Sequence, residues 1–261
     1  MTHFPRLPHV SLEGLQLGEA LALLGADACA ALPDIHTQPQ AYLQAVIDGL
    51  CEMSLRDPLT GAANRRQLMA ALEGELDRVA RSGDAALLLM VDVDHFKNVN
   101  DQYGHNIGDL ALQHITRLLR QCVRPMDTMA RYGGEEFAIV LPACQPAYGK
   151  TVADRIRQTI ERNPLPWAPG QLLPLTVSIG GAYALQWIRS TSELWIERAD
   201  QQLYFAKNQG RNCVCIEPQP DSTVSAEEKN LLFSGPIDSI DAAEPADPST
   251  APASCKPTGN V

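Results

Sequence analysis

The clearest candidates for chemistry lie in residues 133–136, a Gly-Gly-Glu-Glu sequence between the segment 128–132 and the apolar run 138–141. Two glycines at this place predict the tight turn of a β-hairpin, because glycine adopts positive φ without steric cost. A backbone without side chains lets a bulky ligand lie close to it, and the carboxylates of Glu135 and Glu136 suit a hard cation such as Mg²⁺. The pattern predicts a site for a nucleotide and a metal ion; the alternative is a solvated hairpin tip.

A second acidic cluster, Asp92 and Asp94, follows the apolar run 85–91. A continuous apolar run of this length predicts a buried central strand. The alternation of the two aspartates places them on the same face of the strand end. Because an unpaired buried carboxylate is costly, we expect a cation or a functional role at this end.

Six blocks of sequence resemble, in the same order, the GGDEF family of diguanylate cyclases over residues 56–216. The blocks are residues 57–61 with 64–66, 92–101, 103–105 with 108–109, 131–137, 176–181, and 199–212. The resemblance implies a nucleotidyltransferase that condenses two GTP molecules into cyclic di-GMP, a second messenger. It also implies an α/β fold of the α+β, palm-like kind, with a central mixed sheet flanked by helices and a signature β-hairpin.

The resemblance assigns the acidic residues to metal binding. Asp92, the backbone carbonyl of Val93, and Glu135 would hold Mg²⁺, with Mn²⁺ as the alternative ion. Glu135 would also be the general base, and whether Glu136 shares a metal is left open. Lys97 would stabilise the transition state; otherwise it is an exposed lysine at a strand end.

Further positions match the family's substrate contacts. Asn100 and Asp109 resemble the residues that read guanine, and His105 between them either lines the same pocket or caps a helix. Lys207 and Arg211 match positions that bind the β- and γ-phosphates, although cations are also common near the C-terminus of a helix.

An inhibitory site for the product is implied by Arg124 and Asp127, which form an Arg-x-x-Asp motif six positions before Gly133. Arg155 is the candidate for a second arginine from the following helix. The alternative is a turn contact between Arg124 and Asp127 worth under ~1 kcal/mol. The chain departs from the family at Ala62 and Ala63, where a leucine is usual beside the expected guanine pocket, and nucleotide affinity could suffer.

The elements that position these residues alternate between helix and strand, as in an α/β domain. Helices are expected over 64–81, 110–123, 148–162 and 192–207, and further strands over 175–184 and 213–216.

The chain before this domain divides into a short regulatory segment, 1–40, and a stalk helix, 41–55. Leu43, Val46, Leu50 and Met53 recur at the spacing of a coiled coil, which favours pairing of two subunits over a helix that packs on its own domain. Two GTP molecules must also be opposed, so a homodimer is expected. Residues 1–55 are too short for an ordinary sensor domain, and we expect a separate regulatory protein to act on them.

The composition narrows the class of protein. A formal net charge of −10 argues against a nucleic-acid or anionic-membrane surface, and no apolar run approaches the ~20 residues of a membrane span. Seven cysteines without Cys-x-x-Cys spacing fit a reducing, cytoplasmic compartment. Residues 217–261, with two Lys against eight Asp or Glu, predict a disordered acidic tail.

Two other functions stay open. A degenerate receptor would bind cyclic di-GMP or GTP without catalysis. Another nucleotidyl cyclase would have the same fold but use a nucleotide with a different base. Asp92, Lys97 and Glu135 disfavour the first, whereas Asn100 and Asp109 disfavour the second.

Overall fold

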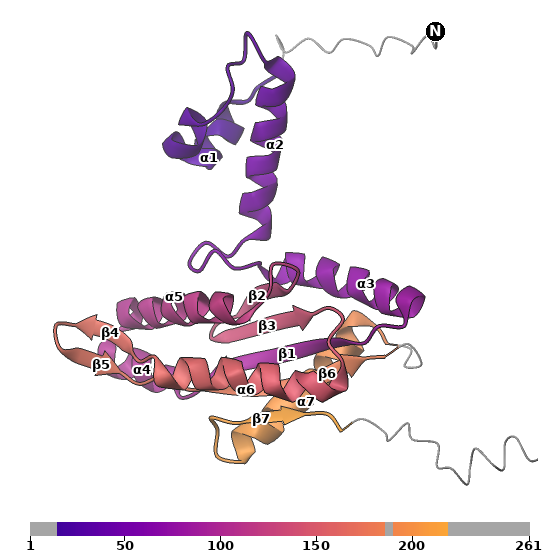
Figure 1. The fold of residues 1–261 in the computed structure, drawn as a ribbon. Helices are drawn as coiled ribbons and strands as arrows, with labels where there is room; N and C mark the ends of the chain where they lie inside the picture. Colours follow the sequence, from indigo (N-terminus) through magenta and orange to yellow (C-terminus); the bar gives the residue numbers. More distant parts are fainter. Residues whose placement is uncertain (1–14, 186–189, 219–261) are drawn as a thin grey trace, which may run out of the picture. The chain divides into compact units, whose positions relative to one another are not determined.

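The computed structural model describes residues 15–185 and 190–218 and contains a mixed sheet flanked by helices (Figure 1). The helices are α1 Gly18–Ala30, α2 Pro39–Leu55, α3 Arg65–Ser82, α4 Phe96–Tyr103, α5 His105–Cys122, α6 Pro146–Arg162 and α7 Ser192–Asn208. The strands are β1 Ala86–Val93, β2 Thr128–Gly133, β3 Glu136–Leu141, β4 Leu165–Ala168, β5 Gln171–Leu173, β6 Val177–Ala184 and β7 Val214–Ile216. The predicted acidic tail lies outside the described residues from residue 219 onward.

The main sheet has the strand order β2-β3-β1-β6-β7. β1 pairs with both β3 and β6 in antiparallel fashion, whereas β6 and β7 are parallel. The predicted central mixed sheet is therefore confirmed. β4 and β5 form a separate two-stranded hairpin.

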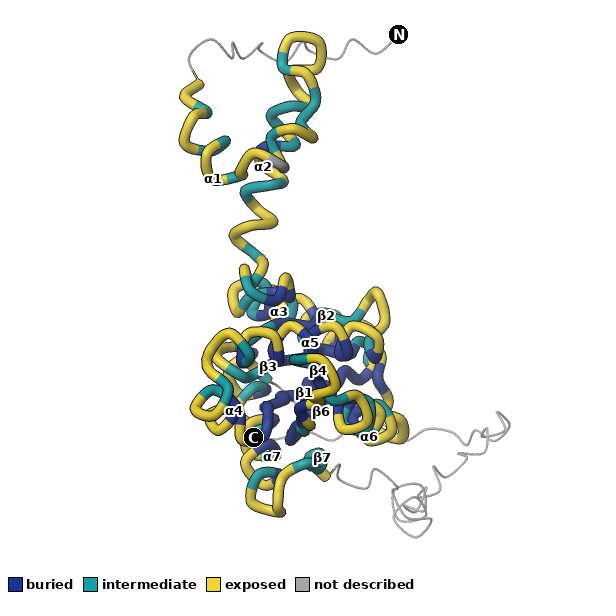
Figure 2. Tube along the Cα trace, turned by 90° about the vertical axis from the view of Figure 1, so that its left-hand side faces the viewer, coloured by how far each residue is buried: buried dark blue, intermediate teal, exposed yellow. Residues whose placement is uncertain are grey.

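All eight residues of β1 are buried, as its unbroken apolar run predicts, and they alternate between two cores. Leu87 and Leu89 belong to a core with α5 and α6, whereas Leu88 and Met90 belong to a core with α3 and α7. Figure 2 shows the buried residues gathered on the strands and on the inner sides of these helices. Asp92 continues the alternation of Leu88 and Met90, so it lies on the α3/α7 face of the sheet.

Helix α7 approaches β6 closely because β6 carries glycine where the two elements cross. A Cβ atom added to Gly180 would lie 2.0 Å from the backbone nitrogen of Leu203 and 2.3 Å from the carbonyl oxygen of Ala199. Any side chain at position 180 would therefore push α7 away from the sheet. This close packing sets the position of Lys207, near the C-terminal end of α7.

The predicted hairpin is formed by β2 and β3, with a register shift between Arg131 and Gly133 and with Gly134 at φ 45°. Arg131 braces the tip, since its Nε donates to the carbonyl of Gly134 at 2.9 Å. Its Nη1 lies 3.2 Å from both carboxylate oxygens of Asp57. Thr60 also donates to Asp57 through its amide and its hydroxyl.

Replacing Asp57 by Asn is expected to lower the free energy of unfolding by about 2 kcal/mol, because a largely buried charged pair loses one partner. Burial raises the pKa of Asp57, but hydrogen bonds from Thr60 and the charge of Arg131 outweigh it, so the pKa is below its usual 3.8. This contribution is present above pH 3.8 and is lost as the pH falls through the lower folded-state value. Thermal unfolding as a function of pH measures both effects.

Asp77→Asn is the matched control, since Asp77 is an exposed aspartate on α3. Equal melting temperatures for the Asp57 and Asp77 variants at neutral pH would show that the contact between Arg131 and Asp57 does not stabilise the domain.

Two features differ from what the sequence pattern predicts. Lys97 lies in the first turn of α4, a helix that was not expected, rather than at a strand end. The β4–β5 hairpin was not expected either. Helix α1, in the predicted regulatory segment, is interrupted at Gly25 with φ 80° and ψ 163°.

The seam on α2 is only partly available to another subunit. Val46 is 2% exposed, and a Cβ atom on Gly49 would lie 2.6 Å from Leu24 of α1. Met53 and Ile47 are instead 51% and 53% exposed. Part of the apolar face of α2 is thus covered by the chain's own α1, and part stays open. Among the described residues, no helix is both long and apolar enough to cross a membrane.

Candidate active site

The acidic residues meet where β1 ends beside the β2–β3 hairpin. Asp92 is directly opposite Glu136 in the β1–β3 register, so both side chains lie on the same face of the sheet. The amide of Val93 donates to the carbonyl of Glu135 at 3.3 Å, which joins the turn of the hairpin to the end of β1. The fold therefore brings together all four residues that were predicted to bind metal.

Asp92 is 7% exposed, and its Oδ2 lies 2.8 Å from Nζ of Lys207 on α7. Burial raises the pKa of Asp92 above its usual value, although the contact with Lys207 opposes the rise. Burial also raises the pKa of Glu136, and the charge of Asp92 adds to that shift. A positive charge at this place would therefore favour the ionised form of both carboxylates.

The donor atoms fit a hard divalent cation. The carboxylates of Asp92 and Glu135 and the carbonyl of Val93 are the oxygen ligands that Mg²⁺ prefers, and Mg²⁺ normally keeps further water or phosphate ligands. In residues 15–185 and 190–218, no three acidic, histidine or cysteine side chains are close enough to hold a metal alone.

Asp94 differs in role from Asp92, although it lies on the same face as predicted. It is 6% exposed and accepts hydrogen bonds from the hydroxyls of Thr176 and Ser178 and from the amide of Asn212. These three donors satisfy its carboxylate, so the burial of Asp94 needs no cation.

The predicted guanine readers lie across the junction of α4 and α5. Gly104, at φ 82°, forms the sharp turn between these helices. Asn100 packs against Gly108 so closely that a Cβ atom on Gly108 would lie 2.0 Å from Asn100 Oδ1. Asp109 follows Gly108 and is exposed, so a carboxamide of α4 and a carboxylate of α5 belong to residues beside the same junction.

His105 is the first residue of α5 and is exposed. The N-cap of α5 is Gly104, and no side chain caps that end of the helix. The capping role that was considered for His105 therefore has no support, and its place beside the junction is compatible with a pocket role.

The remaining predicted cations are close to the same edge. Lys97 is exposed on the first turn of α4, which begins three residues after Val93. Lys207 contacts Asp92, and Arg211 is exposed in the turn between α7 and β7, at φ 67°.

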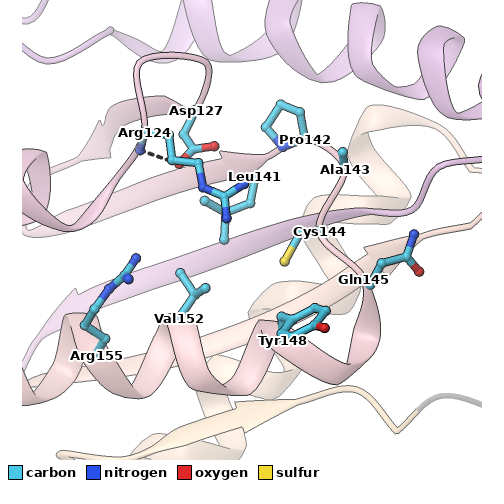
Figure 3. Close-up of a pocket in the computed structure, with 10 residues that line it drawn as sticks. All are labelled: Arg124, Asp127, Leu141, Pro142, Ala143, Cys144, Gln145, Tyr148, Val152 and Arg155. Atoms are coloured by element: carbon cyan, nitrogen blue, oxygen red, sulfur yellow. Dashed lines mark hydrogen bonds between the residues drawn. The ribbon is translucent and has the colours of Figure 1, made fainter.

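The three predicted inhibitory-site residues line one pocket (Figure 3). Asp127 Oδ2 accepts a hydrogen bond of 2.6 Å from the amide of Arg124, and Arg155 Nη2 donates to the carbonyl of Cys122 at 2.9 Å. Burial raises the pKa of Asp127, whereas the charges of Arg124 and Arg155 lower it. The turn contact considered for Arg124 and Asp127 is thus real, yet it uses the backbone of Arg124 and leaves its guanidinium in the pocket.

Tyr148 and Cys144 also line this pocket, although the sequence pattern did not predict them. Tyr148 is 67% exposed on the first turn of α6. Residues 148, 152 and 155 have the spacing of one helix face, and this spacing was the available signal for Tyr148 once Arg155 was chosen. Cys144 gave no comparable signal.

The alanines that depart from the family are deeply buried. Ala62 and Ala63 are 1% and 3% exposed, and they pack in the two different cores. Ala63 also continues the sheet edge, because its amide donates to Met129 and its carbonyl accepts from Arg131.

Residues 54–213 match the family described as "Diguanylate cyclase, GGDEF domain". The response regulator PleD of Caulobacter vibrioides is 38% identical over 174 residues, which cover 66% of this chain and 38% of PleD. The diguanylate cyclase DgcP of Pseudomonas aeruginosa is 42% identical over 161 residues, which cover 62% of this chain and 24% of DgcP. The chain thus spans less than half the length of these two relatives.

Two solved structures share the fold. One is the diguanylate cyclase SiaD of Pseudomonas aeruginosa in complex with its activator SiaC, with a TM-score of 0.62, 35% identity, and coverage of 70% of this chain and 69% of that chain. The other is the coiled coil and GGDEF domain of DgcB of Caulobacter crescentus in complex with c-di-GMP. Its TM-score is 0.63 at 28% identity, with coverage of 67% of this chain and 92% of that chain.

Proposed function

The chain belongs to the GGDEF family of diguanylate cyclases, and we propose that it condenses two GTP molecules into cyclic di-GMP with release of pyrophosphate. In this reaction each ribose 3′-hydroxyl attacks the α-phosphate of the other nucleotide. The observation that carries the proposal is the meeting of Asp92, Val93, Glu135 and Lys207 at the end of β1. We place this domain at residues 56–216, in the cytoplasm, where GTP is available.

The proposed metal ligands are Asp92, the carbonyl of Val93 and Glu135, with Glu136 as the further carboxylate of the same face. Bound Mg²⁺, or Mn²⁺, would acidify the 3′-hydroxyl and offset the charge of the phosphates. Glu135 takes the hydroxyl proton, because it lies on the hairpin tip rather than in the buried pair of Asp92 and Lys207.

The other residues bind and orient the substrate. Asn100 and Asp109 read the guanine base across the α4–α5 junction, and His105 lines the same pocket. Lys97 stabilises the charge that develops on the α-phosphate, while Lys207 and Arg211 hold the outer phosphates.

Each domain supplies half of an active site, so the proposed enzyme acts as a homodimer. Holding two substrates face to face removes much of the entropic cost of their meeting. The open part of the α2 face, with Ile47 and Met53, supports pairing through the stalk.

We expect residues 1–55 to control this pairing through a separate regulatory protein. SiaD was solved with an activator, and the exposed apolar residues of α1 and α2 here provide a surface for a partner. Deleting residues 1–40 is expected to lower the rate per subunit at low protein concentration and to abolish activation, since α1 is removed. Full activity of the truncated chain, measured as cyclic di-GMP formed over time, would contradict this role.

The pocket of Arg124, Asp127 and Arg155 is proposed to bind the product and inhibit the enzyme. Arg124→Ala is expected to raise the product concentration for half-inhibition by at least about tenfold, because one charge-assisted contact to phosphate is lost. Arg162→Ala is the control, since Arg162 is an exposed arginine of α6 outside this pocket. Equal inhibition of both variants and the wild type would exclude the pocket as the inhibitory site.

Incubation of the full chain with GTP and Mg²⁺, followed by mass spectrometry of the products, tests the function. Cyclic di-GMP and pyrophosphate are expected from the wild type, and neither from Lys97→Met. Binding of cyclic di-GMP without turnover would instead identify a receptor. A cyclic product from ATP would identify a different nucleotidyl cyclase.

A further inference from the structure

Resting on the proposed function, we propose that Asp94, Asn212, Arg157 and Glu161 form a clamp that positions Arg211 for the outer phosphates of GTP. Asp94 is thus a positioning residue, in contrast to Asp92, which faces the substrate. The clamp acts on the α7–β7 turn, defined here as residues 209–213.

The first part of the clamp is the buried carboxylate of Asp94. Its Oδ1 accepts from the hydroxyl of Ser178 at 2.6 Å, and its Oδ2 accepts from the hydroxyl of Thr176 at 2.7 Å. Oδ2 also accepts from the backbone amide of Asn212 at 2.9 Å. Charged hydrogen bonds of this length are strong in a buried setting. The end of β1 therefore fixes the backbone of the turn at the residue that follows Arg211.

The second part is the side chain of Asn212, which is bound by helix α6. Arg157 Nη1 donates to Asn212 Oδ1 at 3.1 Å, and Asn212 Nδ2 donates to Glu161 Oε1 at 2.7 Å. Arg157 and Glu161 also pair with each other at 2.9 Å. Asn212 thus uses its amide, its carboxamide oxygen and its carboxamide nitrogen to join the turn to β1 and α6.

The turn needs such restraint because of its backbone conformation. Arg211 has φ 67° and Asn212 has φ 45°, so two successive residues that are not glycine lie in the left-handed region. Asparagine tolerates this region, whereas arginine seldom adopts it. Without the hydrogen bonds to Asn212, the turn would relax to other conformations and Arg211 would lose its direction.

The guanidinium of Arg211 is available to bind a ligand. Arg211 is exposed, and within the described part of the chain no hydrogen bond, ion pair or ring contact engages its guanidinium. The turn follows directly after the helix that brings Lys207 to Asp92. Two carboxylates at the end of β1 therefore fix two cations of one segment. Asp92 holds Lys207 directly, and Asp94 holds Arg211 through Asn212.

The test compares the binding of 3′-deoxy-GTP and 3′-deoxy-GMP by calorimetry in the presence of Mg²⁺. Neither nucleotide has the attacking hydroxyl, so binding is measured without turnover, and failure of the clamp is distinguished from failure of the cyclase function. Asn212→Ala is expected to weaken the triphosphate by about tenfold, the loss of one charged phosphate contact. The monophosphate lacks the outer phosphates, so we expect the variant to bind it with the same affinity as the wild type.

A double-mutant cycle separates positioning from general damage. In an Arg211→Ala background, Asn212→Ala is expected to cause no further loss of affinity for the triphosphate. Asn163→Ala is the matched control, because its carboxamide also bonds to α6, at the carbonyl of Thr159, and none of the described hydrogen bonds joins it to the turn. It is expected to leave both affinities unchanged.

Glu161→Ala keeps the test decisive if the Asn212 variant does not fold. Glu161 is exposed on α6, and its loss removes one side of the clamp without touching the core. We expect Glu161→Ala to lower triphosphate affinity by less than Asn212→Ala does. In the Arg211→Ala background, we expect it to cause no further decrease. Equal weakening of both nucleotides, or losses that add to that of Arg211→Ala, would overturn the proposal.

Discussion

Glu135→Gln is expected to reduce cyclic di-GMP formation by at least about a thousandfold, since it removes a proposed metal ligand and the general base together. A carboxamide neither takes the proton of the 3′-hydroxyl nor supplies the anionic oxygen that Mg²⁺ prefers. Because Glu135 lies on the hairpin tip and is only partly buried, the variant is expected to fold as the wild type does.

The measurement is the initial rate at saturating GTP and Mg²⁺, with the melting temperature as a check of folding. Glu193→Gln, an exposed glutamate in the first turn of α7, is the control. A Glu135 variant that keeps a tenth or more of the wild-type rate would show that another group acts as base and ligand.

Asp109→Asn is expected to decrease kcat/KM for GTP by about 100-fold or more, because the site would lose the acceptor for two guanine N–H donors. Asparagine keeps the size of the side chain, so the effect reports on hydrogen bonding and charge. The loss is expected mainly in KM, since the base is remote from the reacting phosphate.

Inosine triphosphate, which lacks the exocyclic amino group of guanine, makes this prediction specific. The wild type is expected to prefer GTP over inosine triphosphate, and the variant is expected to lose most of that preference. Asp101→Asn, at another exposed aspartate of the same region, is the control. Unchanged discrimination in the Asp109 variant would place the guanine pocket elsewhere.

The sequence pattern predicts the elements that carry long, regular signals. The apolar run of β1 indicates a central strand, and the Gly-Gly turn indicates the hairpin; both are present. Helix α4 was missed because its eight residues are mostly polar and follow directly on the acidic strand end. The β4–β5 hairpin was missed because its strands have four and three residues, one of them Pro166.

The contrast between Asp92 and Asp94 shows where a pattern stops being informative. Alternation correctly places both on one face, yet the partners that decide their roles come from distant segments. Thr176 and Asn212 lie 82 and 118 positions from Asp94 in the chain. Their approach depends on how β6 and α7 pack, which no local spacing contains.

The stalk shows the same limit. The spacing of Val46 and Met53 gives an apolar seam, but spacing does not reveal which neighbour covers it. In the structure α1 covers the seam around Val46 and leaves Met53 exposed. Pairing of two chains through α2 stays a prediction.

The most direct test of the account is the rate of cyclic di-GMP formation per subunit, measured from GTP and Mg²⁺ as the protein concentration is raised over several decades. If two half-sites must meet, the rate per subunit rises with concentration and then levels off when all chains are paired. Robust synthesis with a rate per subunit that does not change down to the lowest concentration, together with a monomeric mass in solution, would contradict the account.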